Sequence, residues 1–180
     1  MLIVEKTIPD HCFSLAPNLK AIDRYEIAVL GYDPIHALLL PFRYARPNTC
    51  TYTILTEHTN EVVAIFGVIP TKTNPKVGYI WFLSSNLLDK YYRYFLRGNK
   101  RWLSYMEEHY EYLCNYIIAE HTLSIRWLKW QGFIFSKEIL VKGVKMYYFY
   151  KRLHGAIKKG TQPVLREIGP YWATEISHQG

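Results

Sequence analysis

Three stretches rich in β-branched and aromatic residues follow one another closely, at residues 49–56 (TCTYTILT), 61–69 (EVVAIFGVI) and 77–83 (VGYIWFL). The links between them are short and polar, with HTN in the first link and TKTNPK in the second. Such stretches, separated by turn residues, are typical of strands that pair in the antiparallel sense. The sequence therefore predicts a three-stranded meander, with the other elements packed on its faces.

Apolar residues recur at helical spacing in four other stretches, namely residues 21–30, 33–44, 100–113 and 123–130. The last of these stretches ends at Gly132, a typical stop signal. The remaining predicted strands are residues 2–5, 115–119, 133–135 and 144–150, the last two forming a hairpin with its turn near residues 141–143. This order predicts an α/β (α+β) fold with a mixed, mostly antiparallel sheet and helices on both faces.

The chain has 180 residues and a formal net charge of +7 at pH 7. This length fits one domain, which we expect at residues 1–152. Residues 153–180 are expected to be a C-terminal extension that lies on the domain or on a partner. The positive charge attracts anions such as phosphates or nucleic acid, although excess lysine and arginine also occur merely for solubility.

The three cysteines, Cys12, Cys50 and Cys114, are odd in number and far apart. They form no Cys-x-x-Cys or Cys/His spacing, so we expect neither a disulfide framework nor a metal site, and a reducing compartment is the simplest one. The longest apolar runs are interrupted by Asp33-Pro34 and by Pro41. No membrane span is therefore expected.

Residues 90–102, KYYRYFLRGNKRW, contain five cationic side chains among five aromatic ones and no acid. Three interpretations are open: a surface for nucleic acid, a cradle for the phosphates of a cofactor, or the solvated edge of a helix. We predict that residues 90–96 are a loop or a short helical turn whose rings pack on the edge of the sheet. Residues 97–101 are predicted to lie at the start of the next helix, with Asn99 as its cap.

Residues 115–133 resemble the end of the core of the GCN5-related N-acetyltransferase (GNAT) family, which typically shows N-x-x-A-x-x-x-Y-x-x-x-G-F. Gly132 and Phe133 match this motif. His121 stands in place of the asparagine, Ser124 in place of the alanine and Leu128 in place of the tyrosine. The resemblance implies the GNAT fold, in which the sheet splays between its fourth and fifth strands.

Four segments are also similar to a group of small GNAT-type proteins of tailed bacteriophages. They are APNLKAIDRYEIAVLG at residues 16–31, IFGV at 65–68, VGYIWFLSS at 77–85 and SIRWLKWQGF at 124–133. Some members of this group are described as internal or morphogenesis proteins of the virion, and others as acetyltransferases. The resemblance implies a phage protein located in the host cytoplasm or in the virion.

The GNAT resemblance also implies acetyl-CoA as the cofactor, bound where the fourth strand separates from the fifth. Backbone N–H groups at the end of the fourth strand would stabilise the oxyanion, and the pyrophosphate would lie at the start of the next helix. The family's loop there reads Q/R-x-x-G-x-G/A, and residues 97–101 keep one glycine of the pair. The cofactor-binding residues expected on this basis are Leu83, Ser84, Ser85, Arg97, Gly98, Asn99, Lys100 and Arg101.

The catalytic residues are less clearly indicated. GNAT enzymes commonly use a tyrosine as general acid, and Leu128, at the matching position, has no proton to give. His121 is the candidate for proton transfer because the ordinary pKa of histidine lies near neutrality. The alternative is that His121 caps the following helix. Tyr116 lies on one predicted strand, and Tyr147, Tyr148 and Tyr150 lie on a neighbouring one. In a chain with sixteen tyrosines we interpret them as packing residues.

Three functions are compatible with these features. The first is an acetyl-CoA-dependent N-acyltransferase that modifies an amine of a host or phage protein. The second is a catalytically inactive GNAT-fold protein that binds a protein partner in virion assembly or is carried inside the virion. The third, which the resemblance does not favour, is a nucleic-acid-binding protein that uses residues 90–102.

Overall fold

The computed structural model describes residues 1–153, and the expected C-terminal extension lies, beyond Leu153, outside these residues. The described residues form two compact units. Unit 1 comprises Met1–Ile69 and Ile80–Met106, and unit 2 comprises Pro70–Tyr79 and the residues from Glu107 on. The single domain expected at residues 1–152 stays a prediction.

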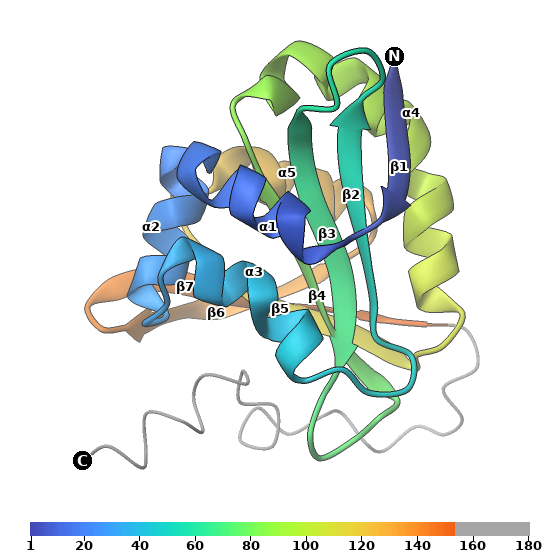
Figure 1. Ribbon diagram of the computed structural model, residues 1–180. Coiled ribbons are helices and arrows are strands. Elements are labelled where there is room, and N and C mark those ends of the chain that lie inside the picture. Colours follow the sequence, from blue (N-terminus) through green and yellow to red (C-terminus); the bar gives the residue numbers. More distant parts are fainter. Residues whose placement is uncertain (154–180) are drawn as a thin grey trace. The chain divides into compact units, whose positions relative to one another are not determined.

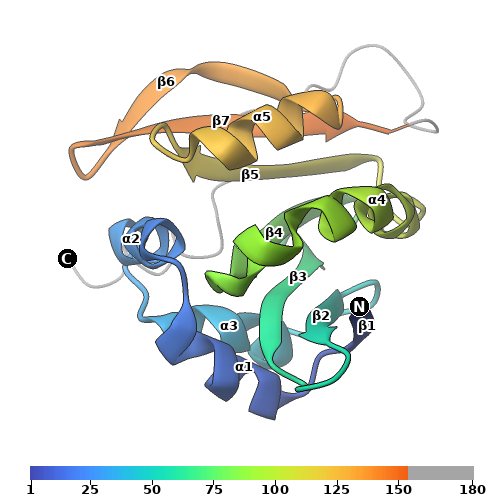
Figure 2. The same ribbon diagram turned by 90° about the horizontal axis from the view of Figure 1, so that it is seen from above.

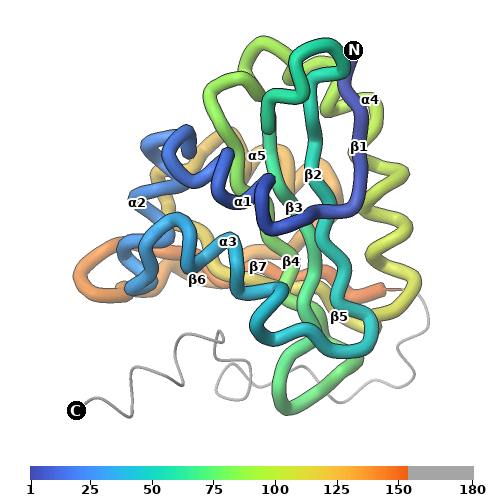
Figure 3. Tube along the Cα trace, in the orientation of Figure 1, coloured from blue at the N-terminus to red at the C-terminus, as the bar shows by residue number. Residues whose placement is uncertain are grey.

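Five α-helices and seven strands make up the described part of the chain (Figures 1 and 3). The helices are α1 (Pro9–Leu15), α2 (Ala21–Val29), α3 (Pro34–Arg43), α4 (Leu87–Glu107) and α5 (Thr122–Trp130), with a short 3-10 helix (Ala16–Asn18) after α1. The strands are β1 (Leu2–Lys6), β2 (Cys50–Thr56), β3 (Val62–Pro70), β4 (Val77–Ser84), β5 (Tyr112–Ile118), β6 (Ile134–Val141) and β7 (Val144–Arg152).

The strands are hydrogen-bonded in the order β1-β2-β3-β4-β5-β7-β6. β1 pairs with β2, β2 with β3, β5 with β7 and β7 with β6, all in the antiparallel sense. β4 and β5 pair in the parallel sense, from Val77 with Tyr112 to Tyr79 with Cys114. Both strands continue beyond these pairs, β4 to Ser84 and β5 to Ile118. The predicted mixed, mostly antiparallel sheet is therefore confirmed.

Different helices cover the two faces of the strands in unit 1 (Figure 2). Successive residues of a strand point to opposite faces, and Leu83 and Phe82 of β4 illustrate this. Leu83 belongs to a buried cluster with Leu15 of α1 and Leu38 of α3. The Phe82 ring instead lies 5.0 Å, between centroids, from Phe95 of α4. The expected helices on both faces are therefore present in this unit.

Unit 2 contains the second hairpin and α5. α5 buries Ile125 and Leu128 and ends before Gly132, whose φ of +86° is favourable for glycine. The turn between β6 and β7 is formed by Lys142 and Gly143, with φ of 49° and 79°. The predicted helix stop and the predicted hairpin turn are therefore confirmed.

The prediction for residues 90–113 is wrong at both ends. Residues 90–96 are neither a loop nor a short turn, because α4 begins at Leu87 and runs through them to Glu107. Leu113, expected on the buried face of this helix, lies in β5. A further helix, α1, lies at Pro9–Leu15, a stretch that is not among the predicted helices.

The length of α4 has a simple physical cause. Large apolar residues recur every seven or four residues on the side of the helix that packs on the sheet. They are Leu88, Phe95, Trp102 and Met106. This packing outweighs Gly98, which lies in the middle of the helix and costs roughly 1 kcal/mol relative to alanine.

Candidate functional site

The connection between β4 and α4 consists of Ser85 and Asn86. It contains no glycine, and it turns at once into the helix. The N–H of Leu88 donates to the Ser85 carbonyl at 3.1 Å, and the N–H of Asp89 donates to the Asn86 carbonyl at 3.2 Å. The connection is therefore a tight turn rather than an extended loop.

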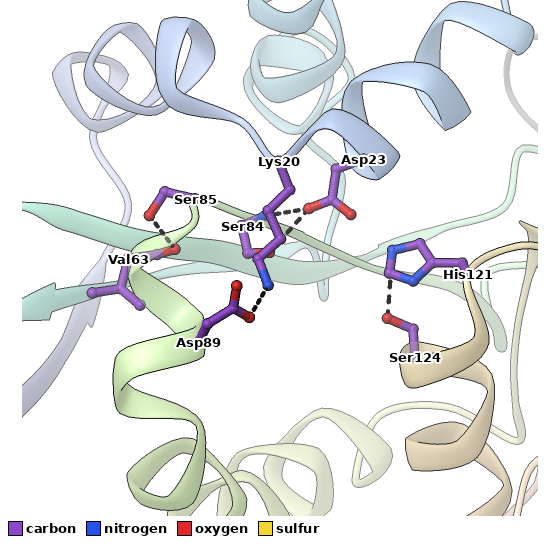
Figure 4. Close-up of polar contacts among 8 residues, drawn as sticks. All are labelled: Lys20, Asp23, Val63, Ser84, Ser85, Asp89, His121 and Ser124. Atoms are coloured by element: carbon purple, nitrogen blue, oxygen red, sulfur yellow. Dashed lines mark hydrogen bonds and ion pairs between the residues drawn. The ribbon is translucent and has the colours of Figure 1, made fainter.

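A buried carboxylate accepts hydrogen bonds from the last residue of β4 (Figure 4). The Ser84 N–H and the Ser84 hydroxyl both donate to Oδ2 of Asp23, at 2.8 Å and 3.0 Å. Asp23 lies in the first turn of α2, where a carboxylate interacts favourably with the helix dipole, and it is 3% exposed. The Ser84 carbonyl accepts from the Lys20 N–H at 2.8 Å. Both backbone groups of Ser84 are therefore paired within unit 1.

The N–H and the hydroxyl of Ser85 are also paired with protein atoms. Its N–H donates to the Val63 carbonyl at 2.9 Å, and its hydroxyl lies 3.1 Å from the carbonyls of both Val62 and Val63. These contacts hold the turn against β3. The expectation that the N–H groups of Ser84 and Ser85 are free to bind an oxyanion is therefore wrong, because protein atoms already accept both hydrogen bonds. Leu83, the third residue expected there, packs in the buried cluster described above.

Two opposite charges meet at the start of α4. The ammonium group of Lys20 and the carboxylate of Asp89 form an ion pair (Figure 4). Lys20 is largely buried, whereas Asp89 is exposed. Within the described residues, nothing accepts a hydrogen bond from the N–H groups of Asn86 and Leu87. The helix start therefore retains free donors, but with a carboxylate beside them.

Residues 97–101, expected to cradle the pyrophosphate, do not lie at a helix start. They lie near the middle of α4, ten residues or more from Leu87, where backbone N–H groups take part in the helix's own hydrogen bonds. Asn99 is buried and does not cap the helix, while Arg97, Gly98, Lys100 and Arg101 are exposed. The physical argument that placed a phosphate at these five residues therefore no longer applies.

In unit 2, His121 precedes α5 and makes no side-chain cap. Its Nε2 lies 3.5 Å from the Ser124 hydroxyl, at the limit of a hydrogen bond, and its carbonyl accepts from the Ile125 N–H at 3.0 Å (Figure 4). Leu128, at the position of the family's tyrosine, is buried. The Leu128 side chain has no proton to give and so has no acid–base role. The role of His121 in proton transfer stays a prediction.

One group on β5 and β7 contains the buried Cys114 and Tyr148 and the half-buried Tyr116. The rings of Tyr116 and Tyr148 lie 5.2 Å apart between centroids. Burial raises the pKa of both phenols, and the neighbouring Cys114 raises them further. Burial also raises the pKa of the Cys114 thiol to about 12. A phenol or thiol of raised pKa is a weaker acid at neutral pH, which agrees with the interpretation of these tyrosines as packing residues.

Among residues 1–153, no group of three or more His, Cys, Asp or Glu side chains could hold a metal ion. None of the helices in this part of the chain is both long and apolar enough to cross a membrane.

Comparison with protein-family models and with curated proteins gave no match. Solved structures do match. The phosphinothricin acetyltransferase of the GNAT superfamily from Sinorhizobium meliloti, in complex with acetyl-CoA, aligns with a TM-score of 0.63 over 93% of this chain and 97% of that one, at 14% identity. The ribosomal-protein-S18-alanine N-acetyltransferase from Escherichia coli aligns with a TM-score of 0.61 over 90% and 100%, at 9% identity.

A GCN5-related N-acetyltransferase from Kribbella flavida aligns with a TM-score of 0.61 over 84% of this chain and 98% of that one, at 13% identity. The chain has the GNAT acetyltransferase fold. At these identities the likeness concerns the fold and not the activity.

The GNAT fold implies acetyl-CoA as a ligand, and the residues of unit 1 can be compared with what that ligand needs. A thioester oxygen needs free N–H groups at the end of β4, and those of Ser84 and Ser85 are occupied. A pyrophosphate needs a connection that curls round it, and the two-residue turn before α4 has no glycine. Asp89 adds a negative charge beside the turn. These residues do not fit acetyl-CoA in the manner that the GNAT resemblance implies.

Sequence reasoning missed Asp23. Its only local signal is an acidic residue in the first turn of a predicted helix, which is common and indicates a favourable dipole interaction. Its partner Ser84 lies 61 positions further along the chain. The pairing therefore depends on the tertiary fold.

Proposed function

We propose that this chain is a GNAT-fold protein of a tailed bacteriophage that acts by binding a protein partner and transfers no acyl group. One observation carries the proposal: the carboxylate of Asp23 accepts the Ser84 hydrogen bonds that an acyl transferase of this fold would keep for its substrate. A buried carboxylate so placed also repels an oxyanion or a phosphate. On this proposal, the GNAT fold serves as a scaffold that binds the protein partner.

A surface suited to a protein partner lies in unit 2. β6 ends the strand order, and the edge of a sheet offers unpaired backbone groups. Large apolar side chains are exposed on β6 and at the end of α5, with Leu140 70% exposed, Trp130 67% and Ile134 55%. Exposed apolar side chains on an edge strand are typical of protein interaction sites.

The phage origin and a place in the virion, or in its assembly in the host cytoplasm, form part of the proposal. They are supported by the sequence similarity of residues 16–31, 65–68, 77–85 and 124–133 to small phage proteins. Mass spectrometry of purified particles, and of capsids arrested during assembly, tests this part. The protein is expected in at least one of the two preparations, and its absence from both would contradict the proposal.

A second candidate is an acetyl-CoA-dependent N-acyltransferase acting on a protein amine. The specific observation in its favour is the pair of free N–H groups, of Asn86 and Leu87, at the start of a 21-residue helix. Helix starts of this kind bind anions, and Lys20 lies close by in its ion pair with Asp89. Incubation of the full chain with acetyl-CoA and lysates of host and phage, followed by detection of acetylated amines, distinguishes the candidates. A product that depends on the chain would favour the transferase.

A further inference from the structure

The outward face of α4 carries five exposed cations. They are Lys90, Arg93, Arg97, Lys100 and Arg101. Lys90 lies 5.5 Å from the centre of the Tyr91 ring. The other four form no ion pair with any residue of the described chain. The only acids of α4 lie at its ends, Asp89 in the first turn and Glu107 in the last. The middle of the helix is therefore a basic surface without internal neutralisation.

Two aromatic residues of the same stretch, Phe95 and Trp102, pack on the sheet, whereas Tyr94 is 54% exposed. The Trp102 ring lies 5.1 Å from Tyr52 of β2 between centroids, and Phe95 packs on Phe82 of β4. Leu103 and Met106 are buried beside them. The inward face thus fixes α4 to the sheet of unit 1, and the five cations lie on the opposite, exposed side of the helix together with Tyr94.

The cations follow the length of the helix at regular intervals. Positions 90, 93, 97 and 100–101 are three or four residues apart, so one or two cations project from each turn. At a rise of 1.5 Å per residue, residues 90 to 101 extend over about 16 Å, and the whole of α4 over about 31 Å. Neighbouring like charges destabilise a helix unless anions lie beside them. The spacing therefore suits a polymer with regularly repeated negative charges.

We infer that this face of α4 binds double-stranded DNA through its phosphates, without reading the base sequence. The inference does not depend on the proposed function. The major groove of DNA, about 12 Å wide, admits an α-helix, and lysine and arginine are the residues that contact phosphates. The core of a protein–protein interface is depleted in charged residues other than arginine, whereas this face carries two lysines and three arginines and no acid between residues 90 and 101. Stacking on single strands needs several exposed rings, and of the six rings of α4 only those of Tyr94 and Tyr105 are exposed.

The test uses the full chain and a labelled duplex of random sequence, with binding followed by fluorescence anisotropy between 50 and 200 mM KCl. With about four phosphate contacts, the logarithm of the affinity is expected to fall against the logarithm of the salt concentration with a slope of about −3.6. In the double variant Arg93→Glu and Arg97→Glu, we expect affinity to fall at least about tenfold and the slope to lose about two units.

The matched control is the double variant Arg126→Glu and Lys137→Glu, whose exposed cations lie in unit 2. Both variants lower the net charge by four, so a general charge effect would weaken both equally. We expect the control to keep the affinity within about threefold of the unchanged chain. Thermal unfolding checks that the α4 variant folds, which is expected because the substitutions relieve like-charge repulsion.

Four outcomes would overturn the inference. They are no binding at 50 mM KCl, equal loss in both variants, tighter binding of a single-stranded oligonucleotide of the same length, and equal affinity for poly-glutamate. The third would indicate a single-strand site and the fourth a site for an acidic protein segment. The inference is supported if the unchanged chain binds the duplex more tightly than the other two polymers and if only the α4 variant loses this binding.

Discussion

Replacing Asp23 by alanine removes the carboxylate that accepts both hydrogen bonds of Ser84. Ser84 and Asp23 are both 3% exposed, so water cannot take the place of the lost acceptor without a rearrangement of unit 1. A hydrogen bond to a charged group contributes about 1.5–3 kcal/mol to stability, and a buried donor left without an acceptor costs about 1–3 kcal/mol. The two bonds share one oxygen and are not additive. We expect a loss of about 3 kcal/mol in the free energy of unfolding.

Urea denaturation of the full chain, followed by circular dichroism, measures this change. The variant Asp23→Asn is the matched comparison, because it keeps an acceptor oxygen but loses the charge. It should lose about 1–1.5 kcal/mol, clearly less than Asp23→Ala. For a chain of this size, a loss of 3 kcal/mol lowers the melting temperature by about 6–12 °C. A loss below about 1 kcal/mol in Asp23→Ala, or equal losses in both variants, would refute the assigned hydrogen bonds.

Two further predictions concern the helix interior and the thiols. Gly98→Ala should stabilise the protein by about 0.8–1 kcal/mol, because a Cβ there has nothing within 4 Å and lies inside a helix; a loss of stability would show that the residue does not lie in a helix. The same change at Gly67 is the contrast, since its Cβ would lie 2.2 Å from the Cys50 carbonyl oxygen, and that variant should fail to fold. Burial raises the pKa of Cys12 and Cys50 to about 11 and that of Cys114 to about 12. The folded chain therefore retains these protons where the unfolded chain loses them, so its stability is complete below pH 9 and falls as pH rises towards 12. Urea denaturation at pH 8 and pH 10.5 measures this fall, and rapid labelling of the folded thiols at pH 8 would contradict it.

The strands were predictable from the sequence because their signal is local. Residues 49–56, 61–69 and 77–83 combine β-branched and aromatic residues with short polar links, and β2, β3 and β4 occupy these positions within one or two residues. The hairpin turn at Lys142 and Gly143 was predictable for the same reason. The GNAT fold was indicated by the resemblance around Gly132 and Phe133, which follow the end of α5.

The start of α4 was not predictable in this way. Gly98 followed by Asn99 reads locally as a break and a cap, whereas packing on the sheet carries the helix through both residues. Because of this error, the helix start and the pyrophosphate were expected at residues 97–101. The helix begins at Leu87, ten residues or more earlier. The Asp23–Ser84 contact was equally beyond local reasoning, because neither residue belongs to a motif and only tertiary structure brings them together.

Calorimetric titration of the full chain with acetyl-CoA at pH 7.5 tests the central claim most directly, because it asks whether the GNAT fold here still accepts its usual ligand. The S. meliloti acetyltransferase, solved with acetyl-CoA, serves as the positive control. With the Ser84 and Ser85 N–H groups occupied, we predict no saturable heat for this chain at millimolar acetyl-CoA. Binding of one acetyl-CoA per chain at micromolar concentrations would contradict the account and favour the transferase.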